Sequence, residues 1–216
     1  MESIEKIIKN LEKNNMQGFY AKDSKEACKM VEEMLFDGCS ITAGGSVSLK
    51  ESGVWDIINN DKYNFADRSK PGITPEQQQE AFKAAIGCDF FFSSTNALTE
   101  SGELVNVDGF SNRVSSICFG PKNVVLIVGE NKIVKDVAEG FLRIKKVAAP
   151  KNTVRLGINA PCSKLGHCVS LLKNENPCMT DGCQGGTRIC SSYVVSAYQK
   201  TKNRIKVIIC GESLGY

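Results

Sequence analysis

Asn123–Gly129 reads Asn-Val-Val-Leu-Ile-Val-Gly, and this stretch decides the fold. Its unbroken run of apolar residues, most of them β-branched, predicts a strand that is buried on both faces, as in parallel sheets. Cys88–Ser94 and Ile205–Cys210 have the same character. Helical periodicity appears between such strands, so we predict an α/β fold: a mostly parallel sheet with helices on both faces.

The remaining elements follow from periodicity and from turn residues. Thr74 is expected to cap a helix that begins at Pro75, and Ser101-Gly102 to turn a hairpin. Further strands are expected at Gly18–Ala21, Cys39–Ala43, Tyr63–Ala66 and Tyr193–Ala197. Helices are expected at Met1–Asn15, Val47–Asn59, Pro75–Gly87 and Val134–Ala149. Two more helices are expected to begin at Asp23 or Ser24 and at Asn112. Without repeats or long linkers, residues 1–216 are expected to form one domain.

Composition narrows the class of protein. The 216 residues carry a net charge of +3, which is too small to indicate a nucleic-acid partner. Neither a secretory signal nor an apolar run of membrane-spanning length is visible, so we expect no membrane partner. A cytoplasmic location follows as an expectation, and there thiols stay reduced.

The cysteines are concentrated near the end of the chain. Five of the ten lie within Cys162–Cys190, among glycines and prolines that disfavour helix and strand. Residues 161–190 are therefore expected to form an irregular loop whose thiols hold a metal or a cluster. A 4Fe–4S cluster is favoured, and zinc is the alternative, although the short Cys-x-x-Cys pairs typical of zinc sites are absent. Buried free thiols are a third possibility.

The other cysteines and the single histidine have simpler interpretations. His167 can bind a metal, but it is more simply a neighbouring or surface residue. Small buried side chains are expected for the cysteines within predicted helices and strands, which are Cys28, Cys39, Cys88, Cys118 and Cys210.

Polar residues gather after the buried strand Cys88–Ser94, where open α/β sheets bind ligands. Glu100 and Asp108 are candidates for a general acid or base, and Arg113 for bidentate binding of a substrate carboxylate. Lys132 would add positive charge. The amides expected to contact the substrate are Asn96, Asn106 and Asn112. The alternative is that these Asn and Asp residues only stabilise turns.

A second candidate binding element is Gly44-Gly45-Ser46, between a predicted strand and a predicted helix. Free backbone N–H groups at such a junction can bind an anion. A tight turn that needs glycine for its backbone is the competing explanation.

Several motifs together resemble the LUD-domain family, of the lactate-utilisation protein C type. The matching stretches are Thr42–Ser46, Thr95–Ala97, Asn106–Gly109, Asn112-Arg113, Phe119–Lys122, Val128–Val134, Val147–Asn152 and Cys210–Tyr216. The resemblance implies an architecture similar to that of sugar-phosphate isomerases and coenzyme A transferases. It also implies a C-terminal cysteine motif whose cluster ligands here would be Cys162, Cys168, Cys183 and Cys190. The spacer that contains Cys178 is longer than the motif expects.

The resemblance implies an iron–sulfur protein, an oxidoreductase component, in the oxidation of a small 2-hydroxy acid such as lactate. The partners to consider are a small anionic substrate, an iron–sulfur or flavin protein, and a second copy of the chain in a homo-oligomer. A non-redox isomerase, transferase or lyase with a structural or Lewis-acid cluster is the alternative, and a non-catalytic subunit is another. No Gly-x-Gly-x-x-Gly fingerprint is present, which argues against a Rossmann-type NAD site.

Overall fold

The computed structural model describes residues 2–216, so Met1 of the predicted first helix lies outside the described residues. A central sheet of six strands has the order β1-β10-β7-β4-β2-β3, and every neighbouring pair is parallel. In that order the strands are Gln17–Ala21, Ile205–Cys210, Asn123–Gly129, Phe90–Ser93, Ser40–Ala43 and Asn64–Ala66. β7 lies inside the sheet with Val124–Val128 fully buried, which confirms the prediction for this stretch.

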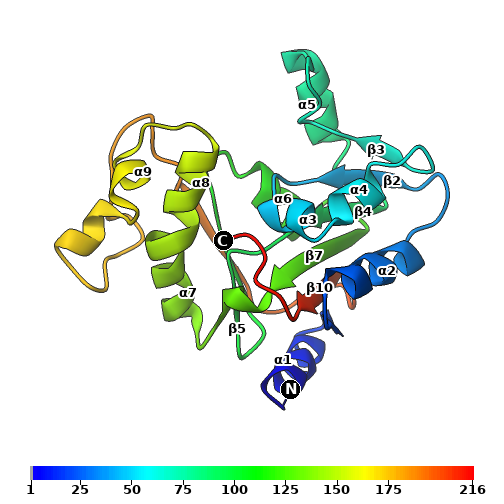
Figure 1. Ribbon diagram of the computed structural model, residues 1–216, viewed down its shortest axis with the longest axis horizontal. Helices are drawn as coiled ribbons and strands as arrows, with labels where there is room; N and C mark the ends of the chain where they lie inside the picture. The colour runs from blue at the N-terminus through cyan, green and yellow to red at the C-terminus, as the bar shows by residue number, and fades with distance from the viewer. Residues whose placement is uncertain (1) are drawn as a thin grey trace.

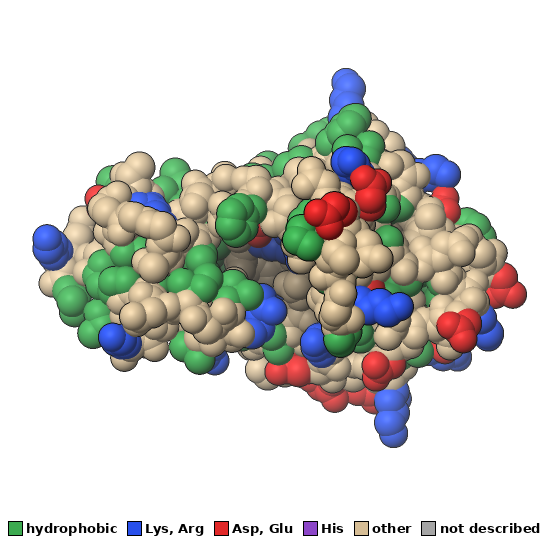
Figure 2. Space-filling model, turned by 90° about the horizontal axis from the view of Figure 1, so that it is seen from above, with side chains coloured by type: hydrophobic (Ala, Val, Ile, Leu, Met, Phe, Trp, Pro, Cys, Tyr) green, Lys and Arg blue, Asp and Glu red, His purple; other side chains and the backbone are tan. Residues whose placement is uncertain are grey.

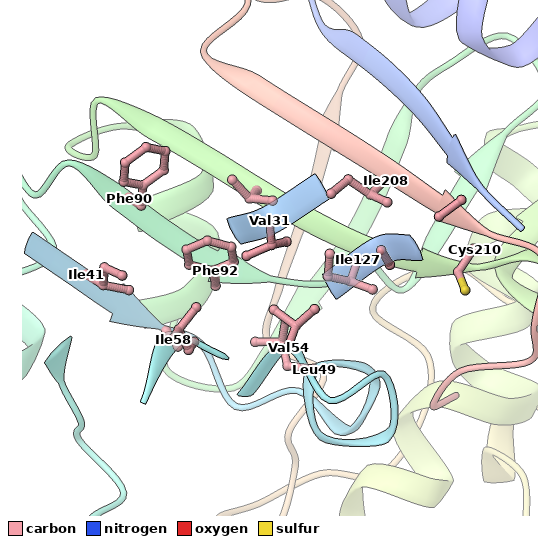
Figure 3. Packing of buried hydrophobic residues seen from close by; sticks show 14 of the residues in the cluster. Val31, Ile41, Leu49, Val54, Ile58, Phe90, Phe92, Ile127, Ile208 and Cys210 are labelled. Atoms are coloured by element: carbon pink, nitrogen blue, oxygen red, sulfur yellow. The ribbon is translucent and has the colours of Figure 1, made fainter. Parts of the chain in front are cut away.

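Three helices cover one face of this sheet: α2 (Ser24–Met34), α3 (Val47–Glu51) and α4 (Val54–Ile58). Figure 3 shows Val31 and Leu49 among the buried side chains that pack near Phe92 and Ile127. The predicted single helix Val47–Asn59 is in fact two. The chain turns at Gly53, whose φ of +78° lies in the left-handed region and interrupts the helix.

The opposite face is covered by α1 (Glu2–Lys13), α6 (Asn112–Cys118) and a second sheet. The strands of that second sheet, in the order β8-β5-β6-β9, are Ile133–Val134, Ala97–Thr99, Leu104–Asp108 and Ser192–Ser196. β5 and β6 form the predicted hairpin, with Gly102 at a φ of +88°. The alternation along β7 explains how both layers form, because Val125 and Ile127 face α2–α4 while Leu126 and Val128 face this side.

The cysteine-rich region forms a lobe beside the main sheet, in yellow and orange in Figure 1. α7 (Val137–Arg143) leads through a π-helix at Ile144–Ala148 into α8 (Ala149–Arg155), followed by α9 (Pro161–Leu165) and a 3₁₀ turn at Val169–Leu172. The prediction that the helix ends before Pro150 was wrong. Pro150 stands in the first turn of α8, where a residue without an N–H is tolerated. α9 and the 3₁₀ turn also correct the expectation of a wholly irregular loop.

The remaining helices are α5 (Pro75–Lys83) and a 3₁₀ turn at Glu130–Lys132. Thr74 caps α5 in a reciprocal capping box with Gln77, as its sequence position predicts. α5 projects from the body in Figure 1 and buries none of its residues. Among residues 2–216, no helix has both the length and the apolar character needed to cross a bilayer.

Candidate functional site

The carboxyl ends of four parallel strands bring the candidate binding residues to one edge of the central sheet. Gly44–Ser46 follows β2, Arg68 follows β3, Ser94 follows β4 and Lys132 follows β7. Ligands bind at this edge in open α/β sheets. Figure 2 shows a hollow between the lobe of α7–α9 and the side that carries α3 and α6, with Lys or Arg side chains at its rim. The sheet therefore assembles much of the predicted polar constellation in one place.

Asp108 and Arg113 form a mostly buried ion pair beside this edge. Arg113 Nε donates to Asp108 Oδ1 at 3.0 Å, and the two side chains are 11% and 10% exposed. Asp108 Oδ2 also accepts the backbone N–H groups of Arg113 and Val114, at 2.9 and 3.0 Å. Asp108 thus holds the first turn of α6 in place. This is a positioning role, in contrast to the predicted acid–base role.

The remaining N–H groups of Arg113 are also used within the protein. Nη1 donates to the carbonyl of Ser94 at 2.9 Å and to Oδ1 of Asn106 at 2.7 Å. Nη2 donates to Oδ1 of Asn96 and to the carbonyl of Val107, both at 2.9 Å. A guanidinium has five N–H donors, so none is left for a substrate carboxylate, contrary to the prediction for Arg113. Arg113 instead joins β6, the end of β4 and α6.

Replacing Asp108 by Asn should lower the free energy of unfolding by about 2 kcal/mol, because it removes the charge from hydrogen bonds that are mostly shielded from water. Denaturant unfolding at neutral pH measures the change. Asp61→Asn, on the exposed surface, is the matched control. An unchanged stability for Asp108→Asn would contradict the positioning role.

Glu100 lies apart from this constellation. It follows β5 at the hairpin end, where its half-exposed side chain approaches Lys6 of α1 at 4.0 Å. Asn96 and Asp108 stand at the other end of the same hairpin, whose antiparallel register pairs Ala97 with Val105. The structure therefore separates Glu100 from Asp108, which lie at opposite ends of the hairpin.

All three predicted amides keep unused polar atoms. Asn106 is fully buried, and its Nδ2 has no acceptor within the described residues. Asn112 lines a narrow groove together with Gly44, Arg68 and Arg113. Asn96 Oδ1 accepts from Arg113 and from the N–H of Val107, but its Nδ2 donates to no acceptor among the described residues. Asn96 and Asn112, which are only partly buried, are thus the amides that a ligand could reach.

Lys132 is the most unusual charged residue at this edge, because its side chain is buried with 3% of its surface exposed. Its Nζ donates to the hydroxyls of Ser48 and Ser94 at 2.7 and 3.0 Å. Within residues 2–216 no carboxylate lies within 4.0 Å of it. Burial, reinforced by the nearby Arg143 and Arg113, lowers the pKa of Lys132 to about 7. An uncharged amine is therefore available near neutral pH.

Two arginines at the glycine pair escaped prediction. A Cβ built on Gly45 would lie 3.3 Å from Nη2 of Arg68 and 3.6 Å from Nη2 of Arg155. Arg68 comes from the loop after β3 and Arg155 from α8, 87 positions later in the chain. No local sequence pattern marks either residue as part of a site. Ser46, predicted only as part of the anion-binding turn, accepts the N–H of Leu49 and caps α3.

The second candidate site is a small cavity in the lobe. Cys162, Cys168, Cys183 and Cys190 all line it. Burial, reinforced by the nearby Cys162, Cys168 and Cys183 thiols, raises the pKa of the Cys190 thiol to about 11. The predicted ligand set is therefore gathered from α9, the loops and the start of β9.

The walls of this cavity supply positive charge and hydrogen-bond donors. Lys145 is buried and donates to the carbonyl of Asp181 at 2.6 Å, while Arg188 donates to the carbonyls of Cys190 and Cys183. Both basic residues line the cavity. Tyr193 also lines it, and its buried hydroxyl has no hydrogen-bond partner in the described part of the chain. These groups can offset the charge of thiolates and donate to sulfur.

Other sulfur atoms lie outside the cavity. Cys178 is exposed and His167 is absent from the cavity lining. Cys39, Cys88 and Cys210 are buried as predicted, Cys28 is half-buried, and Cys118 is exposed, which corrects the expectation for that residue. Across residues 2–216, no group of three or more His, Cys, Asp or Glu side chains is arranged to hold a single metal ion. The four thiols thus surround a space and do not converge on one point.

Comparison with known proteins agrees with this architecture. A DUF162 family protein from Deinococcus radiodurans superposes with a TM-score of 0.50 at 11% identity, over 97% of each chain. Ribose 5-phosphate isomerase A from Neisseria gonorrhoeae superposes with a TM-score of 0.35 at 13% identity, over 63% of this chain and 66% of that chain. Ribose 5-phosphate isomerase A from Methanocaldococcus jannaschii superposes with a TM-score of 0.34 at 19% identity, over 67% of this chain and 65% of that chain.

At 11% identity, the match to the DUF162 family protein is a likeness of fold alone. No curated protein matches the chain significantly. The LUD domain family model, however, matches residues 4–210, which is nearly the whole chain. The chain therefore belongs to the LUD-domain family.

Proposed function

We propose that this protein is an iron–sulfur member of the LUD-domain family, in the subgroup with a C-terminal cysteine motif, and that it acts in the oxidation of a small 2-hydroxy acid. One observation carries the proposal: Cys162, Cys168, Cys183 and Cys190 line a single cavity, while the nearby Cys178 does not. Four thiolates around one space are the ligand set of a 4Fe–4S cluster.

The residues around the cavity fit such a group. Ser170 Oγ donates to Cys168 Sγ at 3.2 Å, and a Cβ on Gly182 would lie 3.3 Å from the same sulfur. Gly182, with a φ of +146°, therefore lets the backbone approach closely. Lys145 and Arg188 place positive charge beside an anionic cluster. Zinc fits less well, since a single zinc ion needs each sulfur about 2.3 Å from one point.

A bound cluster would transfer single electrons or, with an open iron, act as a Lewis acid. The role of the chain's own residues is to hold the cluster, through the four cysteines, and to adjust its charge through Lys145, Arg188 and Tyr193. An iron–sulfur or flavin protein would accept the electrons. The lobe lies beside the hollow at the sheet edge, so acid and cluster would occupy neighbouring parts of one molecule (Figures 1 and 2).

Anaerobic purification and reconstitution with iron and sulfide test this proposal. We expect a brown protein with equal amounts of iron and acid-labile sulfide. A change in the cluster's electron paramagnetic resonance signal on addition of a 2-hydroxy acid and the acceptor protein would support the redox role. A colourless protein without iron after reconstitution would contradict the proposal.

A second candidate function rests on Lys132. A buried, uncharged amine held by Ser48 and Ser94 can act as a general base or can attack a carbonyl carbon. This chemistry suits a non-redox isomerase or lyase, in which a cluster would be structural. A cluster that keeps one redox state during turnover, together with loss of turnover in Lys132→Met, would favour this candidate.

A further inference from the structure

Two guanidinium groups face one glycine without a carboxylate to pair them. Arg68 and Arg155 both place Nη2 within 4 Å of the point where a Cβ of Gly45 would lie. Neither arginine takes part in any ion pair of residues 2–216. The nearby acid, Asp108, is already engaged by Arg113. Like charges at this separation repel each other, and a bound anion would relieve the repulsion.

Both arginines are held in place by contacts that leave donors unused. Arg68 Nε donates to the carbonyl of Ala43 at 3.2 Å, and its guanidinium carbon lies 5.2 Å from the centre of the Phe82 ring. No protein acceptor in the described chain takes a hydrogen bond from either Nη atom of Arg68. Donors fixed in this way lose little freedom on binding a ligand.

Arg155 is fixed in a similar manner. Its Nε donates to Asn152 Oδ1 and to the Tyr216 hydroxyl at 3.0 and 2.8 Å, and its Nη2 donates to the same Asn152 oxygen at 2.8 Å. Nη1 has no acceptor within residues 2–216. The exposed position of Arg155 leaves this side of the guanidinium open to a ligand that enters the hollow.

The glycine turn between the two arginines supplies further donors and the necessary space. The backbone N–H groups of Gly45 and Ser46 donate to no acceptor among the described residues, whereas that of Gly44 donates to Phe92. A side chain at position 45 would fill the gap between the guanidiniums. The glycine therefore keeps open a small space beside the two guanidinium groups.

We propose that Arg68, Arg155 and the Gly44–Ser46 turn form a clamp for the carboxylate or phosphate of a small anion. This inference deepens the proposed function, because it identifies the group by which the protein holds its substrate. The clamp lies close to Lys132 along the chain of contacts: the Gly44–Ser46 turn leads into α3, and Ser48 of α3 accepts a hydrogen bond from the lysine amine. An anion held at Gly45 would extend its remaining atoms along the sheet edge, toward that amine and toward the lobe.

Isothermal titration of the full-length protein with L-lactate and, separately, with inorganic phosphate tests the clamp. Arg68→Gln and Arg155→Gln should each weaken binding about tenfold or more, since each removes charge-assisted hydrogen bonds. Gly45→Val should also weaken binding, by filling the space without changing any charge. Lys62→Gln, an equal charge change at an exposed residue outside the hollow, should leave binding unchanged.

The two ligands identify the source of the anion: tighter binding of lactate indicates a carboxylate, and tighter binding of phosphate indicates a phosphorylated compound. Binding of neither ligand would overturn the inference, and so would equal binding by all four variants and the wild type. Iron content, measured on the same samples, keeps this test separate from the cluster. Anion binding without iron would contradict the cluster proposal and leave the clamp intact.

Discussion

Replacing Cys183 by Ser is expected to abolish the binding of iron and sulfide after anaerobic reconstitution, whereas replacing Cys178 by Ser leaves it intact. Cys183 lines the lobe cavity with the other three thiols, and Cys178 is exposed outside it. Thiolates are the protein ligands of such clusters, and a serine hydroxyl is a far weaker ligand for iron. The two residues are five apart in the same loop, so the pair is a matched comparison.

Iron and acid-labile sulfide per chain, with the visible absorption spectrum, provide the measurement. Circular dichroism of both variants verifies that the fold is retained. Retention of the full cluster in Cys183→Ser, or its loss in Cys178→Ser, would show that the ligand set is wrong. Equal loss in both variants would indicate that the loop tolerates no change and would point away from a four-cysteine site.

Replacing Lys132 by Met is expected to change how the free energy of unfolding depends on pH. The pKa of Lys132 in the folded protein is lowered from 10.5 to about 7, so between these values the unfolded chain binds more protons than the folded one. Stability therefore rises with pH through this window, by up to about 1.4 kcal/mol per unit, and below pH 7 the buried charge destabilises the fold. Lys132→Met should remove this rise and should be the more stable protein at pH 7.

Denaturant unfolding of wild type and variant at pH 7, 8 and 9, under reducing conditions, measures the difference. The raised pKa values of the buried thiols act in the opposite direction, but they are present in both proteins and cancel in the comparison. Lys146→Met, at an exposed position of the π-helix, is the control and should keep the wild-type slope. Parallel curves for Lys132→Met and wild type would show that the lysine is not buried as an uncharged amine.

The elements of the sheet were largely predictable because their signals are local. β10 and β7 occupy the predicted ranges, and Thr74 and Gly102 stabilise the expected cap and hairpin. The errors lie where tertiary packing outweighs a local rule. Pro150 lies inside the continuing helix because a π-helix precedes it, and Cys118, at the end of α6, faces outward although its neighbour Ile117 is buried.

Some features of the candidate site were likewise predictable from the sequence, and others were visible only in the structure. The sequence alone was enough for the α/β class, the LUD resemblance and the concentration of cysteines near the end of the chain, since apolar runs and spaced cysteines are properties of consecutive residues. That four of those thiols line one cavity while Cys178 does not came from the tertiary structure. Only the tertiary structure decided that Arg113 is saturated by internal partners, that Glu100 lies apart and that Lys132 is buried without a carboxylate. It alone brought Arg68 and Arg155 to Gly45. The physical reason is that charge pairing, burial and convergence depend on distances in space between residues far apart along the chain, and no local pattern encodes those distances.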